Sequence, residues 1–272
     1  MNVGAPLGIA GVGLIGGSIA LRARRRGIAT IGFDLDAVAM GLTDSAATSL
    51  EDLAARCRTL VLALPLPATL EAIDVLRART FPDLALVMDV ASVKMPVMER
   101  ASTWAPFAGT HPIAGAERGG AVHAREDLFL GRVWTYVPKQ QESDAHVCSF
   151  IEAMGARPFA IDAEQHDRAL ALTSHLPQLI STMLGAMLEQ SGVRAELGGP
   201  GLASTLRLAG SPWALWETIL RANAPAVETA AREFANRLLI LAEELGAGEL
   251  PRTASSFESA NRAYEKFARE PQ

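Results

Sequence analysis

The sequence predicts an α/β protein with two domains, a mostly parallel sheet domain at residues 1–161 and an all-helical domain at residues 162–272. Up to about residue 160, short apolar runs alternate with helix-like segments, which is typical of a parallel sheet with helices on both faces. From Asp162 onward, apolar residues recur with a period of 3.6 and no segment has the pattern of a strand. The length of 272 residues is enough for two domains.

The strands expected in the first domain are short apolar runs at 7–10, 30–33, 60–64, 84–88 and 133–137. In the second domain, Asp162 and Gln165 form the pattern of a capping box that opens a long helix, and Pro177 predicts a kink in it. A second helical segment is expected over 212–245, ending at Gly246, and a third over 255–269.

Composition excludes several classes of function. The formal net charge of −5 argues against a nucleic-acid or anionic-membrane surface, because those partners are bound through an excess of Lys and Arg. Cys57 and Cys148 have no CxxC partner, so neither a disulfide framework nor a metal site is expected. The chain shows no run long enough to span a membrane and no signal-peptide pattern, and we expect a cytoplasmic protein.

The clearest local motif is Gly11-Val-Gly-Leu-Ile-Gly16, between the first strand and a helix that ends near Gly27. Gly11 permits the tight turn, Gly13 lets the backbone approach a pyrophosphate, and Gly16 lets the helix pack on the strand. In this context the motif predicts a Rossmann-type dinucleotide site that also includes Leu14 and Ile15.

Asp34 ends the second strand 18 residues after Gly16, where a carboxylate can accept hydrogen bonds from the adenosine ribose. A carboxylate repels a 2′-phosphate, and Leu35 and Asp36 supply no cation, so NAD is favoured over NADP. We also expect Leu64 and Pro65, at the end of the third strand, to contact the cofactor.

Four further segments identify a family. They follow the glycine motif in this order: Asp89-Val-Ala-Ser-Val-Lys94, Gly109-Thr-His-Pro-Ile-Ala-Gly-Ala-Glu117, Thr173-Ser-His-Leu-Pro177, and Ser204-Thr-Leu-Arg-Leu-Ala-Gly-Ser211 followed by Trp216. Together they resemble the prephenate/arogenate (cyclohexadienyl) dehydrogenase family over about residues 5–245. The resemblance implies NAD-dependent oxidative decarboxylation of prephenate or arogenate to 4-hydroxyphenylpyruvate or tyrosine, and a homodimer formed through the helical domain.

The resemblance also implies roles for individual residues. His111 is the proton acceptor for the ring hydroxyl, presented by an extended loop, and Ser92 hydrogen-bonds this histidine and the nicotinamide region. Arg207 binds a substrate carboxylate, a task suited to a guanidinium fork. His175 and Trp216 belong to the substrate pocket.

Structural alternatives stay open for each of these residues. His111 could be a structural loop histidine, Ser92 an N-cap for a helix starting near Val93, and Arg207 an exposed ion-pair partner. His175 and Trp216 could be ordinary core residues.

The sequence departs from the family at two positions. Gln178 stands where many members have a second histidine, and Ser204 stands where many have an acidic residue, which leaves substrate gating and the choice of side chain open. Two other functions compete: a dehydrogenase of an amino-substituted prephenate analogue in secondary metabolism, and a non-catalytic NAD-binding sensor. A hydroxyacid dehydrogenase of similar build would use a lysine on the helical domain, but residues 162–245 contain none.

Overall fold

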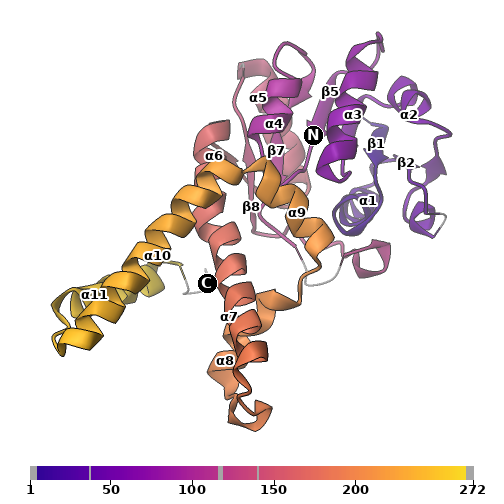
Figure 1. Ribbon diagram of the computed structural model, residues 1–272. Helices are drawn as coiled ribbons and strands as arrows, with labels where there is room; N and C mark the ends of the chain where they lie inside the picture. The colour runs from indigo at the N-terminus through magenta and orange to yellow at the C-terminus, as the bar shows by residue number, and fades with distance from the viewer. Residues whose placement is uncertain (1–4, 37, 116–118, 140, 268–272) are drawn as a thin grey trace.

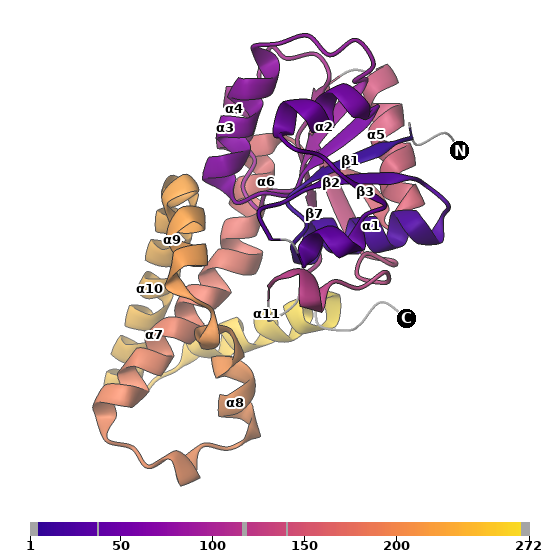
Figure 2. The ribbon, with the colours of Figure 1, turned by 90° about the vertical axis from the view of Figure 1, so that its right-hand side faces the viewer.

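The computed structural model describes residues 5–36, 38–115, 119–139 and 141–267. An α/β domain carries the N-terminus, and long helices extend away from it (Figure 1, Figure 2). The α/β domain contains a six-stranded sheet of order β3-β2-β1-β4-β5-β6 in which every pairing is parallel. This is the strand order of dinucleotide-binding folds, so the predicted fold class is confirmed.

The strands of this sheet are short and lie between two layers of helices. They are β1 (Leu7–Ala10), β2 (Thr30–Phe33), β3 (Ser45–Ala46), β4 (Thr59–Leu62), β5 (Leu86–Asp89) and β6 (Phe107–Ala108). Successive side chains alternate between the two faces, so that Ile9 packs in one apolar cluster and Ala10 in the other. Burial of both faces explains the continuous apolar runs in the sequence.

Helices from different parts of the chain supply the two covering layers. One layer consists of α2 (Leu50–Arg56), α3 (Leu66–Arg77) and α4 (Met95–Arg100). The other contains α1 (Leu14–Arg25) and α5 (Gln141–Ala153).

A second, three-stranded sheet was not predicted. It consists of β7 (Thr110–Pro112), β8 (Val133–Tyr136) and β9 (Arg157–Ala160), with β7 antiparallel and β9 parallel to β8. The expectation that 133–137 joins the main parallel sheet is therefore wrong. The apolar pattern identified a strand there, but the pattern carries no information about which neighbour the strand pairs with.

The helical domain begins with a long, almost continuous rod. Asp162 caps α6 (Ala163–Leu170) by accepting hydrogen bonds from the backbone N–H groups of Glu164 and Gln165, so the predicted cap is confirmed. A π-helical turn at Ala171–His175 leads into α7 (Leu176–Ser191). Pro177 has no N–H to donate, so one hydrogen bond of a regular α-helix is missing here, and the preceding turn is π-helical. The sequence predicted a kink at this place.

The remaining helices are α8 (Pro200–Leu206), α9 (Trp213–Ala222), α10 (Ala224–Ala247) and α11 (Pro251–Phe267). The segment expected as one helix over 212–245 is thus two helices that meet at Asn223. The second one ends at Gly248, whose φ is +75°, and not at Gly246. Within the described residues, no helix has the length and apolarity needed to cross a membrane.

Candidate active site

The glycine motif forms the turn between β1 and α1. Gly11 has φ +84°, and a Cβ there would also collide with the carbonyl group of Ala63. A Cβ at Gly16 would collide with the carbonyl of Gly11. The absence of a side chain at Gly16 therefore lets α1 start directly against the strand ends. Gly13 faces open space, so its backbone is accessible to a ligand. These three environments match the requirements of a pyrophosphate-binding turn.

Asp34 lies at the end of β2, beside the glycine turn. Its Oδ2 accepts a hydrogen bond from the N–H of Val12 at 2.6 Å, and its Oδ1 accepts from the N–H of Asp36 at 2.8 Å. The carboxylate is thereby fixed next to the place where an adenosine ribose would lie.

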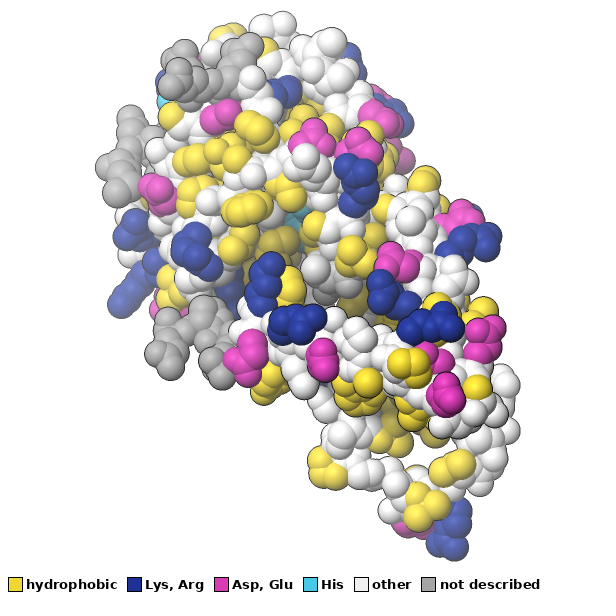
Figure 3. All heavy atoms as spheres, turned by 90° about the vertical axis from the view of Figure 1, so that its left-hand side faces the viewer, with side chains coloured by type: hydrophobic (Ala, Val, Ile, Leu, Met, Phe, Trp, Pro, Cys, Tyr) yellow, Lys and Arg dark blue, Asp and Glu magenta, His cyan; other side chains and the backbone are white. Residues whose placement is uncertain are grey.

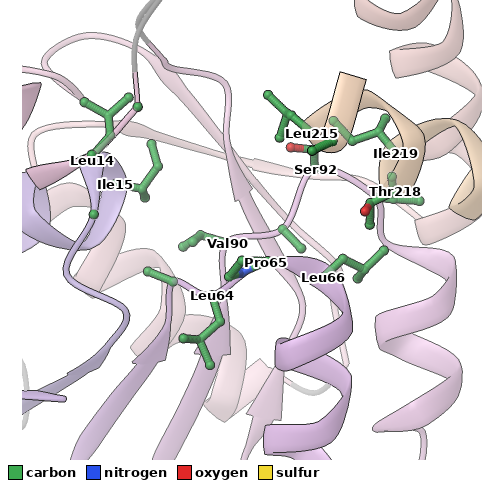
Figure 4. A pocket seen from close by; sticks show the side chains of 17 residues that line it. Leu14, Ile15, Leu64, Pro65, Leu66, Val90, Ser92, Leu215, Thr218 and Ile219 are labelled. Carbon is green, nitrogen blue, oxygen red and sulfur yellow. The ribbon is translucent and has the colours of Figure 1, made fainter. Parts of the chain in front are cut away.

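A cleft of about 530 Å³ opens where β1, β4 and β5 end, and α9 forms its opposite wall (Figure 4). Ligands of parallel α/β sheets bind at this edge. Of the predicted site residues, the cleft brings together Gly13, Leu14, Ile15, Leu64, Pro65 and Ser92. Figure 4 shows Ser92 close to Leu215 and Thr218 of α9, so both domains line the cleft.

Ser92 does not cap a helix. Helix α4 begins at Met95 with Lys94 as its N-cap residue, and the carboxylate of Asp167 accepts both Lys94 N–H at 2.7 Å and Met95 N–H at 2.8 Å. The alternative of Ser92 as an N-cap is therefore wrong. In the described part of the chain, no hydrogen bond joins Ser92 to His111 either, and the Nδ1 of His111 faces His166.

A buried polar framework places the loop that carries His111. Lys94 is fully buried, forms an ion pair with Asp89, and donates to the carbonyl of Thr110 at 2.7 Å. Asp89 in turn accepts the N–H of Thr110 at 3.0 Å, and Trp134 donates its indole N–H to the Thr110 hydroxyl. Every one of these polar groups is paired, as burial requires, so the residue before His111 is rigidly held.

His111 lies on β7 opposite Thr135, whose hydroxyl donates to the His111 carbonyl at 3.1 Å. Its Nδ1 is 3.0 Å from the Nε2 of His166. Burial holds the pKa of His111 well below 6.5, and the nearby His166, Lys94 and His175 lower it further. The imidazole is therefore neutral at physiological pH.

His166 and Asp167, on α6, were missed by the sequence analysis. His166 is fully buried, and its Nδ1 lies 2.7 Å from the Oδ1 of Asp167. The contact between His166 and His111 joins residues 55 positions apart in the chain, so no local pattern could have revealed it. The only available signal was a His-Asp pair one helical turn after the cap at Asp162.

His175 is also buried, and Asn223 fixes its ring. The Nδ2 of Asn223 donates to the carbonyl of Asp167 at 2.7 Å and lies 3.2 Å from the Nδ1 of His175. Because Nδ1 accepts here, neutral His175 carries its proton on Nε2. Burial lowers the pKa of His175 to about 4, although Asp167 acts in the opposite direction.

Trp216 on α9 contacts His175 edge to face, with ring centroids 5.9 Å apart. The structure thus brings these two predicted pocket residues together. Neither of them lines the cleft, and His111 does not line it either. The three residues lie in the layer where β7, α6 and α9 meet.

Arg207 is exposed at the start of a short 3₁₀ turn, Arg207–Gly210, and does not line the cleft. Gln178, which replaces the family's second histidine, is buried and donates its Nε2 to the carbonyl of Leu208 at 2.8 Å. It therefore anchors the turn that carries Arg207 to α7. Ser204 is exposed on α8, and Glu117 falls outside the described residues.

Figure 3 shows a hollow on one face of the molecule with a histidine side chain at its floor and Lys and Arg side chains near its rim. A recess with cations near its rim suits an anionic ligand. Together, the fold and the site define a nucleotide-binding domain of Rossmann type joined to a helical domain, with a buried histidine cluster between them.

The family models agree with this description. The nucleotide-binding domain of prephenate dehydrogenase matches residues 19–159, and the dimerization domain of prephenate dehydrogenase matches residues 162–258. The chain belongs to the prephenate dehydrogenase family. The predictions of the family and of a nucleotide-binding domain are confirmed.

Individual relatives show the same likeness. The chain is 30% identical to a probable prephenate dehydrogenase, NovF, of Streptomyces niveus over 257 residues, covering 87% of this chain and 68% of that protein. For prephenate dehydrogenase of Bacillus subtilis, at 28% identity, the shares are 79% and 63%. The chain thus spans about two thirds of the length of these relatives. Arogenate dehydrogenase of Synechocystis matches with a TM-score of 0.78 and 27% identity over 96% of this chain and 99% of that one.

Proposed function

We propose that this protein is an NAD-dependent dehydrogenase that oxidatively decarboxylates prephenate or arogenate. The observation that carries the proposal is His111, a neutral imidazole on β7 whose loop is held by a buried framework at the end of β5, the strand end after which Val90 and Ser92 line the cleft. A group that accepts a proton at physiological pH is what the oxidation of a ring alcohol needs, and an NAD-binding sensor has no use for one.

The residues of the cleft fit a dinucleotide. Helix α1 starts at the open backbone of Gly13, where N–H groups can meet a pyrophosphate, and Asp34 can accept from ribose hydroxyls. Leu14, Ile15, Leu64 and Pro65 supply apolar walls, and Ser92 lies toward the end that faces α9. Bound NAD would accept the hydride from the ring carbon that carries the hydroxyl. The prephenate dehydrogenase of A. aeolicus, which shares this fold with a TM-score of 0.87 at 24% identity over 96% of this chain and 97% of that one, is a complex with hydroxyphenyl propionate and NAD⁺.

The chemistry sets what His111 must do. As the hydride leaves, the ring hydroxyl becomes more acidic, and its proton shifts toward the imidazole. The carboxylate on the opposite ring carbon then departs as carbon dioxide, and its bonding electrons make the ring aromatic. The phenolate oxygen takes the proton back, so the reaction releases no net proton and the histidine ends neutral.

The substrate is a multiply charged anion, and the helical domain offers it donors. His175 presents its Nε2–H, and Arg207 can pair with a carboxylate in the bidentate manner of a guanidinium. In the described part of the helical domain, three buried polar atoms find no protein partner: Gln178 Oε1, Ser181 Oγ and Trp216 Nε1. Because an unpaired buried group costs about 1–3 kcal/mol, we assign these atoms to the recognition of the polar substrate side chain.

We also propose that the protein works as a homodimer. The domain model that matches residues 162–258 is a dimerization domain, and the helical domain leaves large apolar side chains such as Met187 and Phe257 exposed at 68% and 69%. Hydrophobic side chains also reach the surface of the face in Figure 3. A second copy of the helical domain would cover such a surface.

The test is to follow NADH formation at 340 nm with prephenate and arogenate supplied separately, each with NAD and with NADP. Turnover of either substrate with NAD supports the proposal, and the ratio of the two kcat/KM values identifies the substrate. No turnover of either substrate at saturating NAD by the folded protein would overturn it.

A further inference from the structure

Three side chains form a hydrogen-bonded chain from one domain to the other. His111 Nδ1 lies 3.0 Å from His166 Nε2, and His166 Nδ1 lies 2.7 Å from Asp167 Oδ1. His166 and Asp167 are nearly inaccessible to solvent, at 0% and 3% exposure. In the dry interior such contacts are strong and directional, so the position of each proton matters.

The partners of Asp167 decide those positions. Two backbone N–H groups, from Lys94 and Met95, donate to its two oxygens, so this carboxylate acts as an acceptor. The third N–H that it accepts must then come from His166 Nδ1. We infer the uncharged form of His166, in which the proton on Nδ1 leaves Nε2 bare, so that Nε2 can only accept. His111 therefore donates its Nδ1–H to His166, and its own Nε2 is left bare.

We propose that His166 and Asp167 are positioning residues that set His111 as a base at Nε2 and share the positive charge while that nitrogen holds the substrate proton. This inference rests on the proposed function, because it concerns the same reaction. It adds to that function two residues of the helical domain that act on the proton acceptor of the nucleotide-binding domain.

The charge balance supports this role. The substrate hydroxyl transfers its proton to Nε2, which makes His111 cationic, and its Nδ1–H bond to His166 then strengthens. His166, itself hydrogen-bonded to the anion Asp167, is a better acceptor than an isolated imidazole. The proton returns to the phenolate oxygen when carbon dioxide leaves, so the buried chain needs no exit to solvent.

The charged and polar groups around His111 disfavour its protonated form, and the hydrogen-bonded link through His166 to Asp167 offsets this effect. Lys94, whose ammonium is paired with Asp89, faces His111 from the nucleotide-binding domain, and His175 faces it from the π-helical turn. Both make a positive charge on His111 less favourable. Asp167 is the carboxylate linked to His111 through His166, so removing His166 disconnects His111 from it.

The competing explanation is that His166 and Asp167 only hold the domains together. A double-mutant cycle separates the two, because residues that act through one group have non-additive effects. We expect His166→Phe to lower kcat by about 10- to 100-fold with KM within threefold. In a His111→Asn background, the same change should lower kcat by less than twofold. His146→Phe, on the exposed side of α5, is the matched control and should leave kcat unchanged.

His166→Gln gives a graded test that does not depend on Phe being tolerated. The amide oxygen can still accept from His111 Nδ1–H, but it is not linked to Asp167, so kcat should lie between those of the wild type and His166→Phe. In the cofactor-free protein, ¹⁵N NMR should show His111 protonated at Nδ1 in the wild type, and no single tautomer in His166→Phe.

The outcomes are distinct from those that test the function. An inactive wild type with prephenate and arogenate would remove the proposed function, while the NMR tautomer could still be measured. Two results with an active wild type would overturn the inference and leave the function standing. One is that the effects of His111→Asn and His166→Phe on kcat multiply, and the other is that His111 carries its proton on Nε2.

Discussion

The two domains differ in how completely they bury their own apolar residues. In the nucleotide-binding domain, two large clusters of buried side chains fill both faces of the parallel sheet. In the helical domain, the buried cluster consists of Ala171, Val227 and Ala230, and large apolar residues on α7, α10 and α11 are exposed. One domain therefore has a complete core in a single chain, whereas the other leaves apolar side chains exposed that the proposed second copy would cover.

This difference carries over to the site. His111, the proposed base, belongs to the well-packed domain, where Asp89 and Lys94 hold its strand, and His166 and Asp167, which we propose orient it, belong to the helical domain. The predictions below test whether the two domains contribute in these different ways, beginning with the largest effect.

Replacing His111 with Asn should lower kcat by roughly 10²–10⁴-fold, because the proton acceptor is lost from the transition state. The dissociation constant of NAD should remain within twofold of the wild type, since the cleft is lined by other residues. Steady-state kinetics and fluorescence titration with NAD measure the two quantities. A variant with near-normal kcat would show that His111 is not the base.

Charges placed on the exposed apolar residues should act differently in the two domains. Leu239→Asp with Phe257→Asp should raise the dimer dissociation constant by at least about a hundredfold, because about 2.7 kcal/mol corresponds to that factor and two charges would face an apolar surface. Val38→Asp, in the nucleotide-binding domain and 70% exposed, is the matched control and should have no effect. Sedimentation equilibrium measures both. Equal behaviour of the two variants would refute the contrast between the domains.

Loss of Arg207 should affect binding more than chemistry. Arg207→Gln removes a contact to a carboxylate that is present before and during the reaction, so KM should rise by about 10- to 100-fold while kcat changes little. Arg207→Lys keeps the charge but loses the fork, so it should remain impaired. If Arg207→Gln instead lowers the melting temperature and leaves KM unchanged, the arginine has a structural role.

The smallest effect concerns cofactor choice. Wild-type kcat/KM should be at least about tenfold higher with NAD than with NADP, because the Asp34 carboxylate repels a 2′-phosphate. Asp34→Ser should reduce this ratio, and Asp36→Ser, two residues further along the chain, serves as the control. Equal use of both cofactors by the wild type would remove Asp34 from this role.

The sequence predicted the elements of this protein better than their long-range contacts. The glycine turn, the parallel strands and the cap at Asp162 depend on neighbouring residues, and all three are found. The pairing of β8 depends on distant partners, whereas the break at Asn223 has a local signal in Pro225 at the start of α10, which the sequence-based prediction did not use. The periodicity of 212–245 could not show that break.

The same distinction applies to the site. Gly13, Leu64, Pro65 and Ser92 meet in one cleft because strand ends of a parallel sheet converge, which is a rule of the fold. His166 and Asp167 reach His111 only through the packing of α6 on the sheet domain. A histidine on an amphipathic helix has the appearance of a core residue until that packing is known.

The pH dependence of kcat/KM tests the central claim most directly, because it reports the protonation of the base in the free enzyme. Burial places the pKa of His111 below 6.5, and only the neutral form can accept a proton. Activity should therefore stay constant from pH 8 down to pH 6.5 and decline only as the pH falls further, and His111→Asn should lack this decline. A decline centred at or above pH 6.5, or one that persists in His111→Asn, would contradict the assignment of His111 as the base.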